Sequence, residues 1–279
     1  MNTLLDISNR IDERSLIVYE AIDNVAKVLG IPYMVVGASA RDLVLHYGFN
    51  ARIKRATADI DVGIQVNNWE EFLGLKTALI EKGFAETGTN HTLTGPDAMR
   101  VDIVPFGETI QEQDRVKWPP DSAISLNVAG FSEALENALT VRIREQLTLD
   151  IPVVSPPGLT LLKLIAWQER DRTLRQRDAS DLKYLLETYQ DLPTVRDAAF
   201  DDPDMMEELD WDLMLAGAHI LGRHSSNIAL EGTADMILSI CQDTGQSEQL
   251  AEDMCQDIES EFERAVELIA AFKNGFMEH

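Results

Sequence analysis

Two aspartates separated by one residue have the clearest chemical potential in this chain of 279 residues. They stand in the segment Ala58-Asp59-Ile60-Asp61-Val62-Gly63-Ile64, where apolar residues alternate with carboxylates. On a β-strand, residues two apart point to the same face, so Asp59 and Asp61 are expected to project together while Ile60 and Val62 face a core. Adjacent carboxylates repel each other unless a cation or a proton neutralises them. Hard oxygen ligands at this spacing suit Mg²⁺, whose shell substrate phosphates complete.

A turn containing glycine and serine precedes the aspartate pair. The apolar run from Tyr33 to Val36 predicts a strand that ends in Gly37-Ala38-Ser39, and a helix is predicted from Ala40 to Tyr47. Backbone N–H groups between a strand and a helix N-terminus can cradle a phosphate, so Gly37 and Ser39 are candidate nucleotide contacts. Either feature alone is a weak signal, because an aspartate pair on a strand often only faces solvent. Their order along the chain favours a catalytic site that binds both metal and phosphate.

Two nearby side chains are further candidates for phosphate binding. Arg41, in the first turn of the predicted helix, can reach a phosphate, or it can form a surface ion pair with Asp42. Thr57, just before the aspartate strand, can contact a ligand, and packing is equally compatible with its position. The basic residues between turn and strand could steer a triphosphate or RNA, or they could be a solvated loop: Arg52, Lys54 and Arg55.

Composition limits the classes of protein to which the chain can belong. Hydrophobic residues make up 45%, which is typical of a globular protein. No apolar run is long enough to cross a bilayer and no signal-peptide pattern begins the chain, so we expect a cytoplasmic protein without a membrane partner. Cys241 and Cys255 are not spaced as a zinc or disulfide framework.

The formal net charge is −24, and the region from Phe200 onward, with 19 acidic and three basic residues, contributes −16 of it. This acidity argues against a general nucleic-acid-binding surface.

Hydrophobic periodicity predicts an α+β fold. A helix is expected over residues 1–29 and another from Trp69 to Lys82. Thr92–Thr94 is predicted to form a hairpin with Arg100–Pro105, in which Asp102 shares a face with Arg100 and Val104. Residues 107–122 are expected to form a long loop, and a last hairpin is expected near residues 139–153. The predicted architecture is a small mixed sheet flanked by helices.

The segment Ser155-Pro156-Pro157-Gly158 is the strongest domain boundary in the sequence. We therefore predict a catalytic domain over residues 1–155 and an all-helical domain over residues 156–279. Within the latter, a helix is expected from Asp178 to Tyr189, preceded by an arginine-rich connection over residues 170–177.

Three segments carry a family resemblance: GASARDLVL, RATADIDVGI and VDIVPFG. They resemble the nucleotidyltransferase superfamily of DNA polymerase β and, more narrowly, the AbiEii-type nucleotidyltransferase toxins of bacterial abortive-infection and toxin–antitoxin systems. The resemblance implies a metal triad in which Asp102, on a later strand, joins Asp59 and Asp61. The alternative is that Asp102 is only a solvated residue of an edge strand.

The stretch KLIAWQERDRTLRQRDASDL is similar to later motifs of the same family, in which a lysine and an aspartate complete the nucleotide site. By this resemblance Lys163 would bind the triphosphate as a point charge, and Asp178 would pair with it or help to activate the acceptor hydroxyl. Asp181 is the alternative to Asp178. The structural alternative is that Lys163 extends to solvent and Asp178 caps a helix.

The resemblance implies transfer of a nucleoside monophosphate from an NTP to an acceptor hydroxyl, with Mg²⁺ or Mn²⁺ as cofactor. It further implies a transfer RNA acceptor and a cognate antitoxin as partners. Two alternatives remain open at this point: transfer to a small molecule such as an aminoglycoside, which an acidic cleft would attract, and a degenerate nucleotide-binding module without activity.

Overall fold

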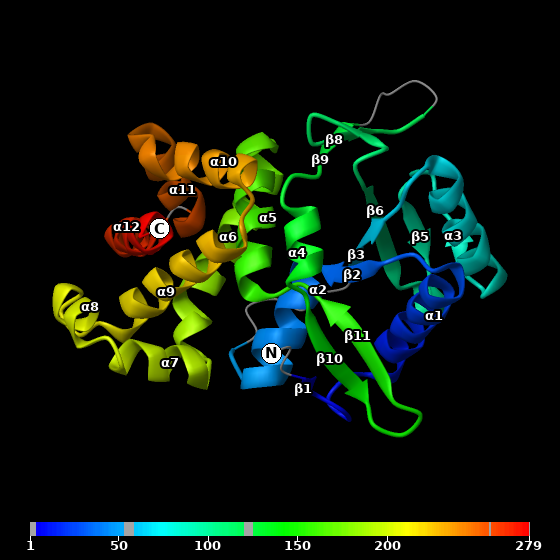
Figure 1. The fold of residues 1–279 in the computed structure, drawn as a ribbon, viewed down its shortest axis with the longest axis horizontal. Helices are drawn as coiled ribbons and strands as arrows, with labels where there is room; N and C mark the ends of the chain where they lie inside the picture. Colours follow the sequence, from blue (N-terminus) through cyan, green and yellow to red (C-terminus); the bar gives the residue numbers. More distant parts are fainter. Residues whose placement is uncertain (1–3, 53–58, 120–124, 257, 279) are drawn as a thin grey trace. The chain divides into compact units, whose positions relative to one another are not determined.

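The computed structural model describes residues 4–52, 59–119, 125–256 and 258–278 (Figure 1). The chain folds as two compact units, Met1–Ser155 and Pro156–His279. The described strands all lie in the first unit, and the described part of the second unit is helical. This arrangement confirms the predicted α+β class, a mixed sheet with helices followed by a helical region. Among the described residues, no helix is both long and apolar enough to span a membrane.

A mixed eight-stranded sheet forms the centre of the first unit, in the order β1-β10-β11-β2-β3-β6-β5-β4. Strands β2 and β3 are antiparallel, whereas β3 and β6 are parallel. The two predicted hairpins are confirmed, because β5 pairs with β6 and β10 pairs with β11 in antiparallel fashion. The bounds are β1 Leu5–Asp6, β2 Tyr33–Val36, β3 Asp59–Gln65, β4 Ala85–Glu86, β5 Thr92–Thr94, β6 Arg100–Phe106, β10 Leu139–Arg144 and β11 Leu149–Val153.

The core of the sheet is built on the alternation seen in the sequence. On β3, Ile60, Val62 and Ile64 are at most 3% exposed, as predicted for the face opposite the aspartates. All residues of β2 are buried, as expected for a central strand covered on both faces.

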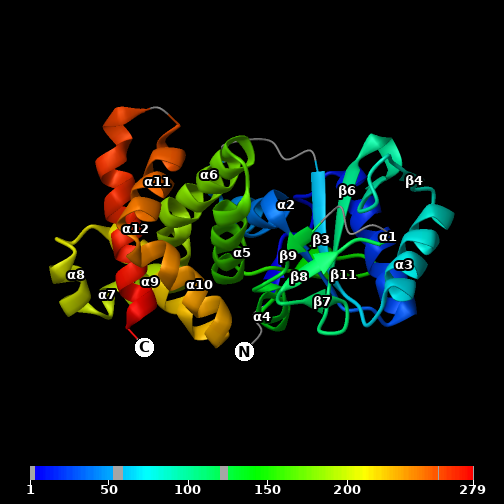
Figure 2. The same ribbon diagram turned by 90° about the horizontal axis from the view of Figure 1, so that it is seen from above.

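Helices cover both faces of this sheet, as Figure 2 shows from above. Helix α1 (Glu13–Leu29) packs beside α3 (Trp69–Glu81) on the face of the buried isoleucines, where Tyr33 donates a hydrogen bond to Asp23 of α1. The aspartate face is covered by α2 (Gly37–Arg41), which continues as the π-helix η1 (Asp42–Gly48), and by α4 (Phe131–Glu136). π-Helical turns are rare and often mark functional sites.

Two sequence predictions for the first unit were wrong. The helix expected over residues 1–29 begins only at Glu13, because the Asp12 side chain caps it by accepting a hydrogen bond from the Ser15 N–H. The loop expected over 107–122 includes two strands of a second sheet, with bounds β7 Gln111–Glu112, β8 Arg115–Lys117 and β9 Ser125–Asn127. Left-handed backbone angles at Gln113 and Asp114 close the β7–β8 turn.

The second unit is a helical assembly in which α9 and α12 make the closest contact. A Cβ on Gly222 would lie 2.8 Å from the Phe276 nitrogen, and one on Gly275 would lie 2.8 Å from the His219 carbonyl carbon. The glycines therefore allow the two backbones to touch. The helices are α5 Pro156–Glu169, α6 Arg172–Thr188, α7 Pro193–Phe200, α8 Pro203–Glu208, α9 Leu213–Ile228, α10 Glu231–Gln242, α11 Thr244–Cys255 and α12 Phe262–Met277.

The arginine-rich segment does not form the connection that we expected. Helix α6 begins at Arg172, six residues before the predicted start at Asp178. The Asp171 side chain caps this helix by accepting hydrogen bonds from the N–H groups of Thr173 and Leu174. The arginines after the cap therefore belong to the first turns of α6.

Candidate functional site

The three predicted metal ligands share one face of the sheet. Asp59 and Asp61 lie on β3, and in the parallel pairing of β3 with β6, Asp61 is opposite Asp102 and Asp59 is opposite Arg100. Directly opposed residues on neighbouring strands point to the same side. Asp59 is exposed, Asp61 is half-buried, and the Asp102 side chain is 18% exposed. The sheet thus places three carboxylates on one surface at the start of these two strands.

Gly37 lies directly against one of these carboxylates. Val36, the last residue of β2, is opposite Asp61 in the antiparallel pairing with β3. Gly37 then turns the chain with a φ of +69°, and a Cβ at this position would lie 2.9 Å from Asp61 Cγ and closer still to Oδ2. Glycine is required here both for its left-handed backbone and for this approach. The N-terminus of α2 is thereby placed beside the aspartate face.

Ser39 is held by groups that the sequence analysis did not identify. Its hydroxyl donates a hydrogen bond to the Val36 carbonyl at 3.1 Å, and the side chain is buried. The Tyr19 phenol, on α1, lies near enough to the Ser39 hydroxyl to interact with it. Burial raises the pKa of the Tyr19 phenol well above its ordinary value, and the carboxylate of Asp61 adds to the shift. Nothing in the sequence distinguishes Tyr19 from a core residue of an amphipathic helix.

The remaining phosphate-binding candidates of the first unit have different outcomes. Arg41 forms the ion pair with Asp42 that we considered as its alternative role, with 2.7 Å between Nη2 and Oδ1, but the pair is buried and not at the surface as expected. Its contact with a phosphate stays a prediction. Thr57 lies outside the described residues, as do Lys54 and Arg55.

Asp102 is engaged by two hydrogen-bond donors. The Thr92 hydroxyl donates to Oδ1 at 2.6 Å, and Arg100 donates through Nε to both oxygens at 3.1 and 3.2 Å. Arg100 Nη2 lies 3.0 Å from Oδ2. Hydrogen bonding to Asp102 raises the pKa of Arg100, and the charges of Asp59 and Asp61 raise it further. Arg100 is therefore a cation of this carboxylate face among the described residues, a role that we did not predict from the sequence.

The donor set fits a hard divalent cation in chemistry and in the face it occupies. Three carboxylates side by side are the oxygen ligands that Mg²⁺ and Mn²⁺ prefer. In the conformation described, however, no three acidic, histidine or cysteine side chains of the described residues converge on one point. Asp102 is instead directed to Arg100 and Thr92. Convergence of the three carboxylates on a metal ion would therefore require side chains of this face to move, and Asp102 would first have to leave its present partners.

A second group of predicted residues meets within the helical unit. Lys163, on α5, lies 2.8 Å from Asp178 and 2.7 Å from Asp181, both on α6. Arg170 contacts the other oxygen of Asp178 at 2.7 Å. Burial works against the charge of Lys163, but Asp181 and Asp178 outweigh it and raise the pKa of this ammonium group. Lys163 thus does not extend to solvent, and it pairs with both candidate aspartates.

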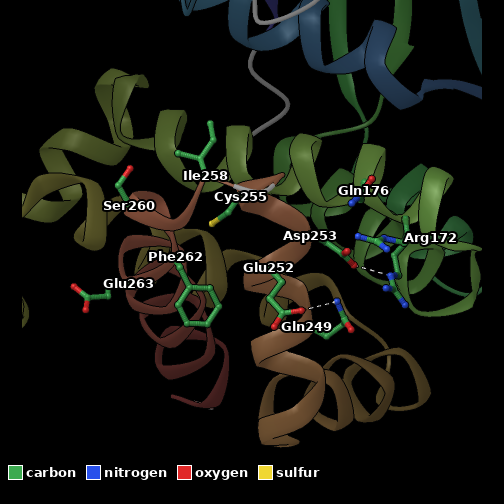
Figure 3. Close-up of a pocket in the computed structure, with 11 residues that line it drawn as sticks. Arg172, Gln176, Gln249, Glu252, Asp253, Cys255, Ile258, Ser260, Phe262 and Glu263 are labelled. Carbon is green, nitrogen blue, oxygen red and sulfur yellow. Dashed lines mark hydrogen bonds and ion pairs between the residues drawn. The ribbon is translucent and has the colours of Figure 1, made fainter.

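A cavity of about 890 Å³ lies elsewhere in the second unit, between α6, α11 and the start of α12 (Figure 3). Arg172 and Gln176 line one side of it, and Phe262 and Glu263 line the other. Arg175 also belongs to the lining. Its volume is in the range of small-molecule pockets.

Asp253 is a buried lining residue of this cavity that contacts both α5 and α6. It lies 2.6 Å from Arg175 Nε and accepts a hydrogen bond from the Trp167 indole at 2.9 Å. Of the arginine-rich segment, Arg175 is thus bound within the unit, whereas Arg172 and Arg177 are exposed.

Comparison with known structures finds distant similarities. The antibiotic-resistance factor ANT(2'')-Ia has 9% identity and a TM-score of 0.34 over 71% of this chain and 98% of its own. The Thermotoga maritima CCA-adding enzyme complexed with tRNA has 14% identity and a TM-score of 0.28 over 96% of this chain and 82% of its own. A CCA-adding enzyme with CTP has 13% identity and a TM-score of 0.27 over 93% and 79% of the two chains. No curated protein matches the sequence significantly.

A family model gives the assignment. The model of the nucleotidyl transferase AbiEii toxin of type IV toxin–antitoxin systems matches residues 27–208, which include β2, β3, β6 and the first two helices of the second unit. The match extends over more than half of the chain. The protein therefore belongs to the AbiEii family of nucleotidyltransferase toxins.

Proposed function

We propose that the protein transfers a nucleoside monophosphate from an NTP to a hydroxyl group of RNA, with Mg²⁺ or Mn²⁺ at the aspartate face. The observation that carries the proposal is the register of β3 and β6, which puts Asp59, Asp61 and Asp102 on one face beside the turn at Gly37. Carboxylates and exposed backbone N–H groups are the complementary ligands of a metal–nucleotide complex.

In this proposal the metal is held by Asp59, Asp61 and Asp102. A divalent ion bound there would stabilise the attacking and leaving oxygens of the displacement at the α-phosphate. The protein contributes position: adjacent strands fix the carboxylates, and burial of Ile60 and Val62 beneath them keeps β3 in place.

The phosphates are proposed to rest on the N-terminus of α2. Gly37 brings the backbone N–H groups of this turn close to Asp61. The Ser39 hydroxyl donates to the Val36 carbonyl, so its proposed contribution is to fix the turn whose N–H groups receive the phosphates. Arg41 and Thr57 are the further phosphate contacts that we propose on this side.

Lys163 and Asp178 are proposed to complete the nucleotide site. Lys163 would supply positive charge for the triphosphate, and Asp178 would hold the ammonium group or assist the acceptor hydroxyl. Asp181 shares the same ammonium group at 2.7 Å, so it is an equivalent candidate for that role.

RNA is the proposed acceptor, with transfer RNA as its first candidate. Arg172 and Arg177 are exposed on α6 and offer charge for a phosphate backbone. The net charge of −24 limits non-specific binding, so recognition has to be local. The same acidity supports a second candidate, a cationic small molecule of the aminoglycoside kind. The cytoplasm is the proposed setting, and the family assignment implies an antitoxin of the same system.

The identity of the product tests this proposal. The purified protein is incubated with Mg²⁺, each α-labelled NTP in turn, and either total bacterial RNA or a set of aminoglycosides. Label in a band of transfer RNA size that disappears with ribonuclease supports the RNA acceptor and identifies the nucleotide. Label in an aminoglycoside alone transfers the assignment to the second candidate. The absence of pyrophosphate release with every acceptor would contradict both.

A further inference from the structure

Arg100 contacts one of the carboxylates that the proposed metal ion would bind. It lies on β6 two residues before Asp102 and is opposite Asp59 on β3. We propose that Arg100 is the resident counter-cation of the aspartate face and that a divalent ion binds only by displacing it from Asp102. This inference rests on the proposed metal site and adds to it the residue that controls how tightly the metal is held.

The hydrogen bonds of Asp102 explain why a metal ion and Arg100 cannot both bind this carboxylate. Arg100 Nε and Nη2 lie 3.0 to 3.2 Å from the carboxylate oxygens, and the Thr92 hydroxyl takes a further position on Oδ1. A carboxylate has about four lone-pair positions. With donors on both oxygens, Asp102 cannot turn to a metal shared with Asp61 until the guanidinium group moves.

The charges of the aspartate face also make Arg100 and a divalent ion compete. Three carboxylates on one face repel each other, and Arg100 neutralises part of this repulsion through its contact with Asp102 and its place opposite Asp59 in the register of β3 and β6. A divalent ion supplies twice the charge at the same place, and it repels the guanidinium group in turn. The metal and Arg100 therefore compete for the same carboxylates.

The exposure of Arg100 makes the exchange easy. Its side chain is 52% exposed, whereas that of Asp102 is 18% exposed, so the arginine can swing into solvent while the aspartate stays in the site. Ion pairs of such exposure are weak. Once the arginine side chain has moved into solvent, Asp102 can turn toward a metal ion.

Mn²⁺ binding to the full-length, metal-free protein tests the inference, with titration calorimetry as the readout. Arg100→Met keeps the length of the side chain and removes its charge. We expect this variant to bind Mn²⁺ about fivefold more tightly than the natural protein, because the competing cation is gone. Arg142→Met is the matched control: Arg142 makes a comparable pair with Asp150, with 2.8 Å between Nε and Oδ1, on β10 and β11. Its removal should leave the Mn²⁺ affinity unchanged.

Thermal unfolding provides a second readout. Without metal, Arg100→Met should melt below the natural protein, because the aspartate face has lost its counter-charge, and it should gain more from added Mn²⁺. Equal Mn²⁺ affinity in the natural protein and in Arg100→Met would overturn the inference.

Asp61→Asn separates this failure from failure of the metal site itself. If Mn²⁺ binding is lost in Asp61→Asn, the site is the one proposed, and only the role of Arg100 is then decided by the comparison above. If Mn²⁺ binding persists unchanged in Asp61→Asn, the proposed metal site is wrong and the inference falls with it.

Discussion

Replacement of Gly37 by alanine should disable the site while the fold survives. Gly37 has a φ of +69°, and an added Cβ would lie 2.9 Å from Asp61 Cγ. The left-handed backbone costs alanine about 1–2 kcal/mol. Carbon atoms in contact prefer about 3.5–4.0 Å, so the Asp61 carboxylate must move by roughly 1 Å, at about 0.5–1.5 kcal/mol if it leaves its rotamer. We expect Gly37→Ala to lower the free energy of unfolding by about 2–3 kcal/mol.

The effect on activity should be larger than the effect on stability. A displacement of about 1 Å in a reacting group can cost about a hundredfold in rate, so we expect nucleotidyl transfer by Gly37→Ala to fall by about that factor. Label transfer from an α-labelled NTP measures the rate, and urea unfolding measures the stability.

Gly30 offers a matched control for this experiment. Its φ is +67°, almost that of Gly37, yet a Cβ there would meet no atom within 4 Å. Gly30→Ala should therefore show the backbone cost, about 1–2 kcal/mol, without loss of activity. Full activity in Gly37→Ala, or an equal loss in Gly30→Ala, would refute the reasoning.

Three further predictions concern the second unit. Lys163→Met removes the cation between two buried aspartates and should lower the free energy of unfolding in urea by about 3 kcal/mol or more. The control is Lys117→Met, at an exposed ion pair in the first unit, which should lower it by less than about 1 kcal/mol. Equal losses of stability in the two variants would contradict the buried network. Burial, together with the charge of Arg223, lowers the pKa of His224. The stability that neutral His224 contributes is therefore complete above the unfolded pKa of about 6.5 and is lost as the pH falls below that value. His224→Gln should flatten this part of the dependence of the unfolding free energy on pH, and an unchanged slope would exclude His224 as its source. Burial raises the pKa of Cys241 to about 12, so iodoacetamide at about pH 8 should alkylate it only after unfolding, as mass spectrometry can show.

Local periodicity was sufficient to predict the main strands of the central sheet and the direction of the side chains on β3, but it missed β1 and the strands β7 to β9. The alternation around Asp59 and Asp61 predicted which residues of β3 are buried, since the period of a strand depends only on the strand itself. The hairpin of β5 and β6 followed in the same way from a turn between two apolar runs. These features required no knowledge of distant parts of the chain.

Contacts between distant segments were not predictable. The approach of Gly37 to Asp61 depends on the pairing of β2 with β3, and the proximity of Tyr19 to Ser39 depends on how α1 packs on the sheet. Arg100 was visible in the sequence as a strand neighbour of Asp102, but periodicity does not show which rotamer a long side chain adopts.

The dependence of catalysis on Asp61 tests the central claim most directly. The measurement is pyrophosphate release from an NTP in the presence of RNA, with and without Mg²⁺, by the natural protein and by Asp61→Asn, alongside their thermal unfolding. We predict Mg²⁺-dependent release by the natural protein and none above background by the variant, although both unfold as ordered proteins. Equal release by the two folded proteins would show that the aspartate face of β3 and β6 is not where the reaction takes place.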